Sequence, residues 1–329
     1  MKAIAFTKYG SPDFLELKEV EKPAPKENEV LVKVIAASVN SWDWELLNGV
    51  PFVNRLMFGL FRPKKIKFLG CDIAGQVEAV GKKVRAFQPG DEVFGDLSSH
   101  GWNGFAEYVS APEVALTQKP EKISFHYAAS MPQASLLAWQ GLNFNGPIRS
   151  GQKVLINGAG GGAGTFAVQI AKSIGAEVTG VDHGCKLDML RDLGADHVMD
   201  YEKEDYTKCG ETYDLILDCV VNRSISDYKR VLKTGGAFAI IGGENGPITK
   251  MMLMSWWTSK TTSYKMGLMM HKANEGLAEM AALVEEGTVK PIIDRCYPLA
   301  DVPEALRYFG EGKVKGKLVI TMSHDDKGS

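Results

Sequence analysis

The stretch KVLINGAGGGAGT at residues 153–165 decides the fold of this chain. An apolar strand runs directly into a glycine cluster, and the amphipathic segment AVQIAKSIGA follows at residues 167–176. A turn with little side-chain bulk lets backbone amides and a helix N-terminus approach a pyrophosphate, whose charge the helix dipole stabilises. The stretch therefore predicts a strand, a turn and a helix that bind a dinucleotide.

The glycine cluster fits the dinucleotide pattern in two registers, which the sequence leaves open: Gly158-x-Gly160-x-x-Ala163 and Gly158-x-x-Gly161-x-x-Gly164. A second strand, Glu177–Val181, follows the predicted helix and ends in Asp182. This spacing of roughly 20 residues is expected for a carboxylate that contacts the adenosine ribose. We expect cofactor contacts from Gly158, Gly160, Gly161, Gly162, Ala163 and Gly164.

Composition excludes several classes of function. The length of 329 residues suits two domains. The net charge is −2 and the sequence has no long run of Lys or Arg, so we expect no attraction to nucleic acid or anionic lipid. The N-terminus MKAIAFTKYG lacks the apolar core of a signal peptide, and no apolar run is long enough to span a bilayer. We expect a cytoplasmic protein with no nucleic-acid partner and no integral membrane association.

The first part of the chain, to about residue 120, consists of short strand-like segments separated by turn clusters such as QPGD. This pattern predicts an all-β module. The expected strands are Ala3–Phe6, Leu15–Val20, Glu29–Ala37, Gly75–Val80, Glu92–Phe94 and Phe105–Ser110.

From about residue 125 to 245 strands alternate with helices, which is typical of a parallel sheet covered on both faces. The expected strands there are Lys153–Ile156, Glu177–Val181, His197–Met199, Leu215–Leu217 and Ala237–Ile241. The remaining segment is too short for a domain of its own. Its expected elements are helices at Asn274–Glu286 and Val302–Phe309 and strands at Lys290–Ile293 and Lys317–Thr321.

We therefore expect the C-terminal segment to return to the β-module and complete it. Residues 1–123 and 264–329 then form one domain, and residues 124–263 form an inserted dinucleotide-binding domain. The active site is expected in the cleft between the two domains, where ligand sites are common.

Several blocks of sequence resemble the zinc-independent medium-chain dehydrogenase/reductase superfamily, close to its quinone oxidoreductase-like and enone reductase branch. These blocks are SVNSWDW (38–44), LGCDIAGQVEAVG (69–81), QPGDEVFG (88–95), GFAEYV (104–109), MPQASLLAWQGL (131–142), the glycine cluster, LGADHVMDY (193–201), YDLILDCV (213–220), GGAFAIIG (235–242) and GKLVI (316–320). The resemblance covers nearly the whole chain. It implies an α/β fold with a GroES-like β-domain and an inserted Rossmann domain, an NAD(P)H-dependent enzyme, and a homodimer.

The residues argue against a metal. Zinc-dependent relatives carry a cysteine where this chain has Asn40 and a His-Glu pair where it has Cys71 and Asp72. The five cysteines are scattered without a CxxC pair, and the family's four-cysteine lobe has no counterpart between Phe94 and Glu107. Because no set of nitrogen and sulfur ligands remains, we expect no catalytic or structural zinc.

The choice of nucleotide depends on the end of the second strand. Asp182 alone favours NADH, because a carboxylate there binds a ribose 2′-hydroxyl and repels a 2′-phosphate. The resemblance implies the opposite, since similar quinone oxidoreductases hold the 2′-phosphate with a lysine and a tyrosine at the positions of Lys186 and Tyr201. We expect NADPH, with NADH as the alternative.

The resemblance also places the nicotinamide end of the cofactor near residues 131–137 and the loop Gly242–Asn245. Leu137 replaces a threonine found in many relatives, so that the carboxamide is expected to bind backbone groups or Ser135. The cofactor contacts expected at this end are Ser135, Gly242, Gly243 and Lys317.

Without a metal or a flavin motif, the chemistry open to this site is direct hydride transfer from the nicotinamide to a conjugated carbonyl or a quinone. Negative charge then develops on the substrate oxygen, and the Asn40 amide is the expected donor to it, unless it only satisfies local backbone groups. Asp43, which lies three residues after Asn40, is the second expected catalytic residue. The segment NGVPF lacks the tyrosine that protonates the product in enoyl-thioester reductases, which leaves solvent or a residue such as His100.

Two apolar segments are candidates for the wall of a substrate pocket, Val50–Phe61 and Met251–Met270. Methionine and aromatic side chains form deformable pockets for hydrophobic substrates. The pocket residues expected are Trp42, Phe52, Met251 and Trp256. Met251–Trp257 equally fits an edge strand in a dimer interface, and peripheral membrane contact is a third reading.

The sequence thus predicts an NADPH-dependent, zinc-free reductase of a small hydrophobic quinone or α,β-unsaturated carbonyl. An NAD(P)-dependent alcohol or aldehyde dehydrogenase is the enzymatic alternative, which the missing zinc ligands disfavour. The alternative outside enzymology is a crystallin-like, NADPH-binding structural or regulatory protein.

Overall fold

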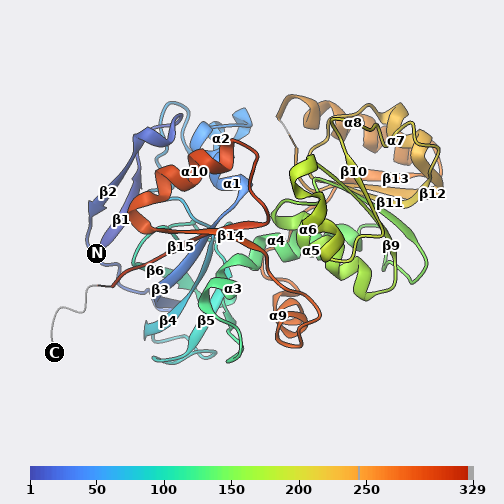
Figure 1. The fold of residues 1–329 in the computed structure, drawn as a ribbon. Coiled ribbons are helices and arrows are strands. Elements are labelled where there is room, and N and C mark those ends of the chain that lie inside the picture. The colour runs from blue at the N-terminus through green and yellow to red at the C-terminus, as the bar shows by residue number, and fades with distance from the viewer. Residues whose placement is uncertain (244, 325–329) are drawn as a thin grey trace. The chain divides into compact units, whose positions relative to one another are not determined.

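The computed structural model describes residues 1–243 and 245–324, which divide into two compact units (Figure 1). Unit 1 comprises Met1–Gln133, Ala273–Glu285 and Ile293–Ser329, and unit 2 comprises Ala134–Lys272 and Glu286–Ile292. The domain limits expected at 123/124 and 263/264 stay predictions, as does a cleft between the domains.

Unit 2 is built on one parallel sheet. Its strands are β8 (Lys153–Asn157), β9 (Glu177–Asp182), β10 (His197–Asp200), β11 (Tyr213–Asp218), β12 (Leu232–Ile240) and β13 (Lys265–Leu268). They lie in the order β10-β9-β8-β11-β12-β13, and every neighbouring pair is parallel. The chain runs outward from β8 to β10 and then crosses to β11, so that the strand order reverses between β8 and β11. Ligands bind beyond the carboxyl ends of the strands at such a point in open α/β sheets.

The helices of unit 2 include α5 (Gly162–Ser173), α6 (Leu187–Asp192), α7 (Ile225–Val231) and α8 (Asn245–Thr261), and α4 (Pro132–Leu142) begins just before its border. The apolar strand centre Val154–Ile156 is completely buried, as expected for a sheet covered on both faces.

The expectation of an edge strand at Met251–Trp257 is wrong, because these residues lie within α8. The edge of the sheet is taken instead by β13, whose residue Met266 pairs with Phe238 of β12. The methionines of α8 are good helix formers, so local propensity agrees with the observed structure.

Unit 1 contains the remaining strands: β1 (Lys2–Phe6), β2 (Leu15–Glu19), β3 (Glu29–Val39), β4 (Asp72–Val80), β5 (Glu92–Asp96), β6 (Tyr108–Pro112), β7 (Thr117–Gln118), β14 (Ile293–Pro298) and β15 (Lys317–Thr321). The main sheet has the order β14-β15-β3-β4-β5-β7, with β6 paired to β3, and β1 pairs with β2. β15 is antiparallel to β3, with Leu318 opposite Val39. The expectation that the C-terminal segment completes the N-terminal β-module is therefore confirmed.

The strand expected at Lys290–Ile293 is wrong, since β14 only begins at Ile293. Pro291 lies inside the expected strand, and proline cannot donate a backbone hydrogen bond to a sheet. The two expected helices are confirmed with shifted ends, as α9 (Leu277–Glu285) and α10 (Val302–Gly310).

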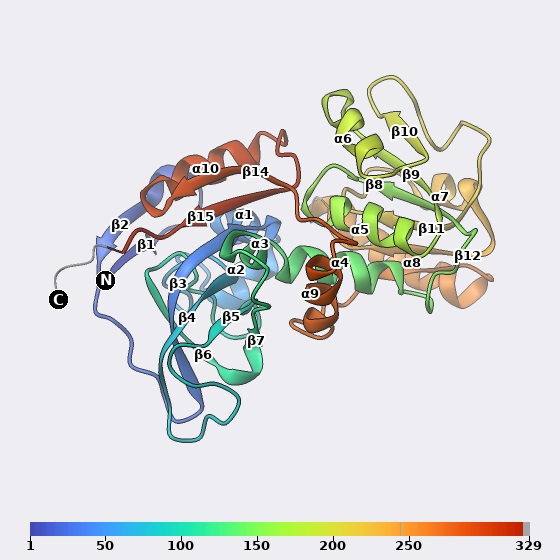
Figure 2. The same ribbon diagram turned by 60° about the horizontal axis from the view of Figure 1, so that its bottom comes forward.

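The other helices of unit 1 are α1 (Ser41–Asn48), α2 (Phe52–Phe58) and α3 (Phe125–Ser130). Figure 2 shows α10 running alongside β14 and β15, and its residue Leu306 is completely buried in the core of this unit. Among the described residues, no helix combines the length and the apolar composition needed to cross a bilayer.

Candidate functional site

The glycine cluster lies in unit 2 between the carboxyl end of β8 and the start of α5. Gly158 has a φ of +83°, a conformation that favours glycine, and its amide donates to Val181 O at 2.9 Å. Gly161 is the N-cap residue of α5. The first amides of α5 have no carbonyl partners within the helix, and the helix dipole adds positive potential there. This arrangement is suited to a pyrophosphate group.

Gly164 allows α5 to pack directly against the turn. A Cβ atom at this position would lie 2.3 Å from Gly158 O and 2.5 Å from Ala159 O. Both distances are too short for any real contact, so a side chain at this position would push the helix away from the cluster. The glycine therefore fixes where the helix N-terminus lies.

Asp182 and Lys186 form a buried ion pair at the end of β9. Lys186 Nζ lies 3.3 Å from Asp182 Oδ1, and each residue is only 6% exposed. The carboxylate also accepts hydrogen bonds from the backbone amides of Gly160 at 2.7 Å and His183 at 2.8 Å. Both carboxylate oxygens are therefore engaged, and the negative charge at the expected ribose site is paired with a cation.

Tyr201 lies on the same edge of the sheet and is 47% exposed. Its ring packs edge-on against His183, with the ring centroids 6.0 Å apart. The structure thus brings Lys186, Asp182 and Tyr201 together around the end of β9, while their contact with a nucleotide stays a prediction.

The residues expected at the nicotinamide end are polar or lack side chains. Ser135 lies in α4, and its buried hydroxyl has no hydrogen-bond partner among the described residues. Such an unsatisfied group is unusual in a folded protein and is available to a ligand. Gly242 and Gly243 follow β12, whereas Glu244 lies outside the described residues.

Asp218 is a buried residue that the sequence reasoning missed. It ends β11 beside the glycine cluster and accepts hydrogen bonds from Tyr228 Oη at 2.6 Å and Asn157 Nδ2 at 3.0 Å. It also accepts the amides of Val220 and Val221, both at 2.8 Å. Asp218 thereby fixes the loop after β11. The signal in the sequence is an aspartate directly after the apolar run LIL.

Unit 1 contains a second group of buried polar residues, around Asn40. Asn40 Nδ2 lies 2.9 Å from Asp72 Oδ2 and 3.3 Å from Cys71 Sγ, and Asn40 Oδ1 accepts a hydrogen bond from Lys317 Nζ. Lys317 Nζ also donates to Val39 O at 3.0 Å and lies 3.8 Å from Asp72 Oδ2. The amide of Asn40 thus has a partner on every side.

Neighbouring strands place these residues together. Lys317 begins β15 beside the end of β3, and Asp72 lies opposite Ser38 of β3 on one side and Asp96 of β5 on the other. Burial lowers the pKa of Lys317 and raises the pKa of Asp72, while their mutual attraction opposes both shifts. We call Asn40, Cys71, Asp72, Asp96 and Lys317 the unit 1 polar cluster.

Asp43 supports this cluster from α1 and is completely buried. Its carboxylate accepts the amide of Asn40 at 2.8 Å and the amide of Gly70 at 2.7 Å. Burial raises the pKa of Asp43 to about 7, although these two hydrogen bonds act in the opposite direction. Asp43 therefore holds the start of α1 against the segment before β4.

Gln133 is a further residue that the sequence reasoning missed. Its backbone amide lies 3.2 Å from both carboxylate oxygens of Asp72, at the start of α4. Asp72 thus caps the helix that carries Ser135. No local motif predicts this contact, because the two residues lie in separate elements.

The four expected pocket residues do not form one group within either unit. Trp42 packs against the core of unit 1, and Phe52 is 61% exposed on α2. Met251 is buried in the core of unit 2, and Trp256 is 60% exposed on α8. A pocket built from them stays a prediction.

Comparison with known proteins identifies the class. Residues 26–121 match the family of alcohol dehydrogenase GroES-like domains, and residues 193–320 match the family described as zinc-binding dehydrogenase. The solved structure of the quinone oxidoreductase from Coxiella burnetii has a TM-score of 0.87 and 30% identity, covering 98% of this chain and 99% of that chain. The fold is thus that of a two-domain dehydrogenase.

Two curated relatives place the chain more narrowly. It is 33% identical to a chloroplastic quinone oxidoreductase of Triphysaria versicolor, over 97% of this chain and 98% of the relative. It is 34% identical to the 2-methylene-furan-3-one reductase of Solanum lycopersicum, over 97% of this chain and 79% of the relative. The chain belongs to the quinone oxidoreductase-like branch of the medium-chain dehydrogenase/reductase superfamily. It is an NAD(P)H oxidoreductase.

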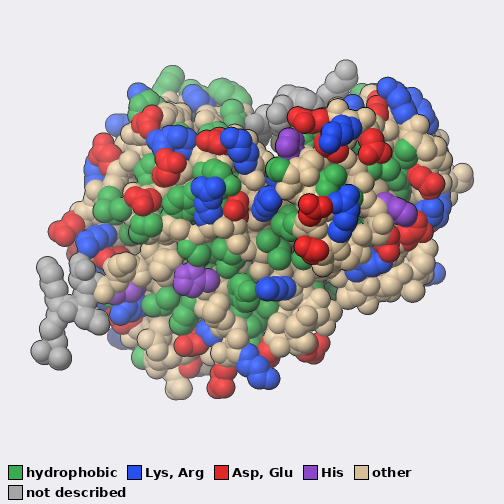
Figure 3. Space-filling view, viewed as in Figure 1, with side chains coloured by type: hydrophobic (Ala, Val, Ile, Leu, Met, Phe, Trp, Pro, Cys, Tyr) green, Lys and Arg blue, Asp and Glu red, His purple; other side chains and the backbone are tan. Residues whose placement is uncertain are grey.

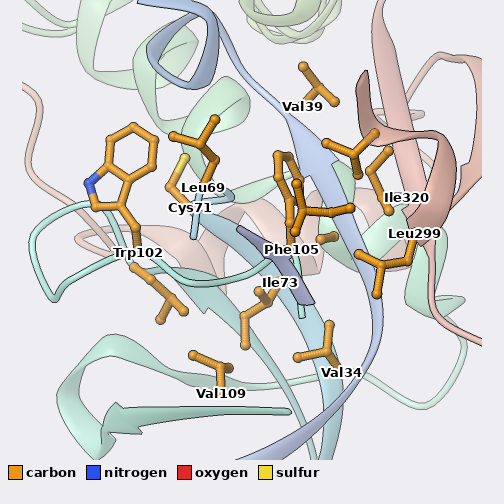
Figure 4. Close-up of a cluster of buried hydrophobic side chains, with 14 of the residues drawn as sticks. Val34, Val39, Leu69, Cys71, Ile73, Trp102, Phe105, Val109, Leu299 and Ile320 are labelled. Atoms are coloured by element: carbon orange, nitrogen blue, oxygen red, sulfur yellow. The ribbon is translucent and has the colours of Figure 1, made fainter. Parts of the chain in front are cut away.

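The family description names zinc, so a metal site is to be considered among the described residues. The only group of three His, Cys, Asp or Glu side chains among them that is close enough to hold a metal ion lies in the unit 1 polar cluster. Donor atoms of Cys71, Asp72 and Asp96 lie within 4.8 Å of one another. Burial and the nearby carboxylates, however, raise the pKa of the Cys71 thiol, and zinc binds the thiolate. Figure 4 shows Cys71 in the same cluster of buried hydrophobic side chains as Leu69 and Trp102.

The carboxylate ligands in this group are also unsuited to zinc. Asp72 already accepts hydrogen bonds from Asn40 and Gln133, and the Lys317 ammonium beside it repels a divalent cation. Zinc sites also need four ligands, or three and a water, rich in imidazole and thiolate. The residues of the cluster do not fit a zinc ion.

Proposed function

We propose that this oxidoreductase uses NADPH to reduce a small hydrophobic quinone or α,β-unsaturated carbonyl without a zinc ion. The observation that carries the proposal is the position of Lys317, whose ammonium lies inside the unit 1 polar cluster and bonds Asn40. A lysine side chain that donates hydrogen bonds is thus already present there. The likeness to a quinone oxidoreductase and to an enone reductase supports the substrate class.

The preference for NADPH rests on the Asp182–Lys186 pair. A free carboxylate at the end of β9 would repel a 2′-phosphate, but this one is neutralised by Lys186 and bonded to two backbone amides. Both of its oxygens already have hydrogen-bond partners, which disfavours a further bond to a ribose 2′-hydroxyl. Lys186 and Tyr201 are proposed to bind the 2′-phosphate, for which a lysine acts as a point charge.

The bound dinucleotide supplies a hydride from the C4 position of its nicotinamide. The Ser135 hydroxyl, which has no partner among the described residues, would hold the carboxamide. Asn40 is proposed to donate to the substrate oxygen by exchanging its contact with Cys71 Sγ, a weak acceptor, for that oxygen. Lys317 and Asp72 keep the Asn40 amide oriented during this exchange. Solvent is proposed to protonate the product.

A direct assay tests the proposal. Purified protein is mixed with NADPH or NADH and with a panel of quinones, enones, enals and saturated aldehydes, and the absorbance of the reduced nucleotide is followed. We expect oxidation of NADPH with quinones or enones. Oxidation with saturated aldehydes alone would show an alcohol dehydrogenase. Tight NADPH binding without turnover would point to the crystallin-like role.

Two further properties are proposed, the oligomeric state and the location in the cell. A homodimer is proposed from the resemblance to this family, and analytical ultracentrifugation tests it. A cytoplasmic location is also proposed, while the Triphysaria relative is chloroplastic. Fluorescence microscopy of the tagged full chain distinguishes the two locations.

A further inference from the structure

Helix α2 has its hydrophobic face on the outside. Four of its residues, spaced i and i+4 as Phe52 with Leu56 and Val53 with Met57, are 50–63% exposed. Its polar residues point the other way: Asn54 Nδ2 donates to Val50 O at 2.8 Å, and Arg55 Nε donates to Gly49 O at 3.1 Å. A helix on the surface of a globular protein normally has the opposite arrangement.

The exposed hydrophobic surface continues beyond the helix. Leu60 is 42% exposed and Phe61 is 88% exposed, and no residue of α2 is buried. Figure 3 shows hydrophobic side chains gathered over α2 at the upper left of the view, with Lys or Arg side chains next to them. Contiguous exposed patches of this kind mark binding surfaces rather than ordinary protein exterior.

Positive charge lies directly beside this surface. Arg62, Lys64, Lys65 and Lys67 are all exposed, and none of them pairs with a carboxylate among the described residues. The amide of Lys64 donates to Phe58 O at 2.8 Å, which turns the basic segment back against the end of α2. The sequence contains no acidic residue between Glu45 and Asp72. The patch was not expected from the sequence, because Pro63 and Ile66 interrupt the basic run.

We propose that this surface, residues 52–67, binds the surface of a membrane that contains anionic lipids. The aromatic and aliphatic side chains would enter the boundary between headgroups and acyl chains, while the four cations contact lipid phosphates. An apolar protein partner would account for the exposed face of α2 but not for four adjacent unpaired cations. The contact is peripheral and leaves the chain outside the bilayer.

Vesicle sedimentation tests the proposal without any measurement of turnover, so its failure is distinguishable from failure of the proposed reductase activity. The full chain is mixed with vesicles of pure phosphatidylcholine or of equal parts phosphatidylcholine and phosphatidylglycerol. We expect binding to the anionic vesicles that weakens with added salt. Because each cation near such a surface contributes about fivefold in partition, Lys64→Ala/Lys65→Ala is expected to lower the partition coefficient roughly 25-fold.

Matched variants separate this surface from general charge and hydrophobicity. Lys82→Ala/Lys83→Ala removes two adjacent exposed lysines elsewhere in unit 1 and is expected to retain binding. Leu56→Ala/Phe61→Ala is expected to lower binding even at low salt, whereas Leu17→Ala/Val114→Ala, which shortens two other exposed side chains, is not. Thermal unfolding checks that each variant folds.

Three outcomes would overturn the proposal. The first is no binding to anionic vesicles by the unaltered chain. The second is an equal loss of binding in the Lys64/Lys65 and Lys82/Lys83 variants. The third is self-association that Leu56→Ala/Phe61→Ala abolishes while vesicle binding is absent, which would assign the surface to a contact between copies of the chain.

Discussion

Lys317 Nζ lies 3.8 Å from Asp72 Oδ2, and both side chains are almost completely buried although 245 residues of sequence separate them (317 − 72). The same ammonium bonds the side-chain oxygen of Asn40 and the carbonyl of Val39. A buried carboxylate and a buried ammonium are each unfavourable alone, but together they stabilise one another when hydrogen bonds complete the set. The pair therefore determines both the stability of unit 1 and the orientation of Asn40.

Removal of the Lys317 cation is expected to destabilise the protein. Lys317→Met leaves the Asp72 carboxylate buried without a counter-charge, which costs about 3 kcal/mol. The double variant Lys317→Met/Asp72→Asn removes both charges and is expected to recover much of that loss. Urea unfolding of the wild type, both single variants and the double variant measures the coupling. Additive losses in the double variant would show that the two side chains do not interact.

Metal removal is expected to leave the enzyme unchanged. Because the donors of Cys71, Asp72 and Asp96 do not fit zinc, dialysis against a chelator should not lower the rate of NADPH oxidation. Added Co²⁺ should give no thiolate-to-cobalt absorption band. A band that disappears in Cys71→Ser, together with one bound cobalt per chain, would contradict this expectation.

Lys186→Ala is expected to change the choice of nucleotide. Loss of the ammonium removes a charge-assisted contact to the 2′-phosphate and leaves that phosphate facing the negative Asp182 carboxylate. The KM for NADPH should therefore rise about tenfold or more. The KM for NADH should change much less. Lys203→Ala is the matched control, since this lysine is exposed and pairs with Asp200 nearby. Equal effects of Lys186→Ala on both nucleotides would refute the phosphate role.

Gly164→Ala is expected to weaken dinucleotide binding, because its Cβ would lie 2.3 Å from Gly158 O. Gly267→Ala is the control in the same unit: it lies in β13, outside the glycine cluster, and its Cβ would lie 3.4 Å from the nearest atom, Phe144 Cζ. Isothermal titration with NADPH measures both variants, and thermal unfolding reports any displacement of α5. Equal affinities in the two variants would show that α5 does not need this close approach.

Glu45 gives the stability a specific pH dependence. Burial raises the pKa of Glu45 from 4.5 to about 7, so the folded state favours the neutral acid. Its favourable contribution is complete below pH 4.5 and is lost as the pH rises toward 7. Glu45→Gln is therefore expected to be more stable than the wild type by about 2–3 kcal/mol at pH 8, and nearly equal to it at pH 4.5.

Urea unfolding at both pH values measures the effect of Glu45→Gln. The matched control is Glu21→Gln, because Glu21 is exposed in the same unit. Its effect on the free energy of unfolding is expected to be small and the same at both pH values. A stabilisation by Glu45→Gln that does not depend on pH would contradict the assignment.

The dinucleotide fold was predictable because its signals are local. The apolar strand, the glycine cluster and Asp182 follow one another within a single strand–turn–helix–strand unit, and all appear where the sequence places them. The segment Met251–Trp257 was not predictable in this way, because its methionines favour a helix whereas its tryptophans are typical of strands. Pairing of β13 with β12 decided between the two.

The sequence by itself determined the α/β fold class and the membership of a reductase family, because the glycine cluster and the other family blocks are each short, continuous stretches of sequence. Only the tertiary structure decided the unit 1 polar cluster, because pairing of β15 with β3 brings Lys317 to Asn40 across 277 residues. It also decided which way α2 faces. The outward face of α2 depends on the carbonyls of Gly49 and Val50 that hold its polar side chains, and no periodicity in the sequence shows them.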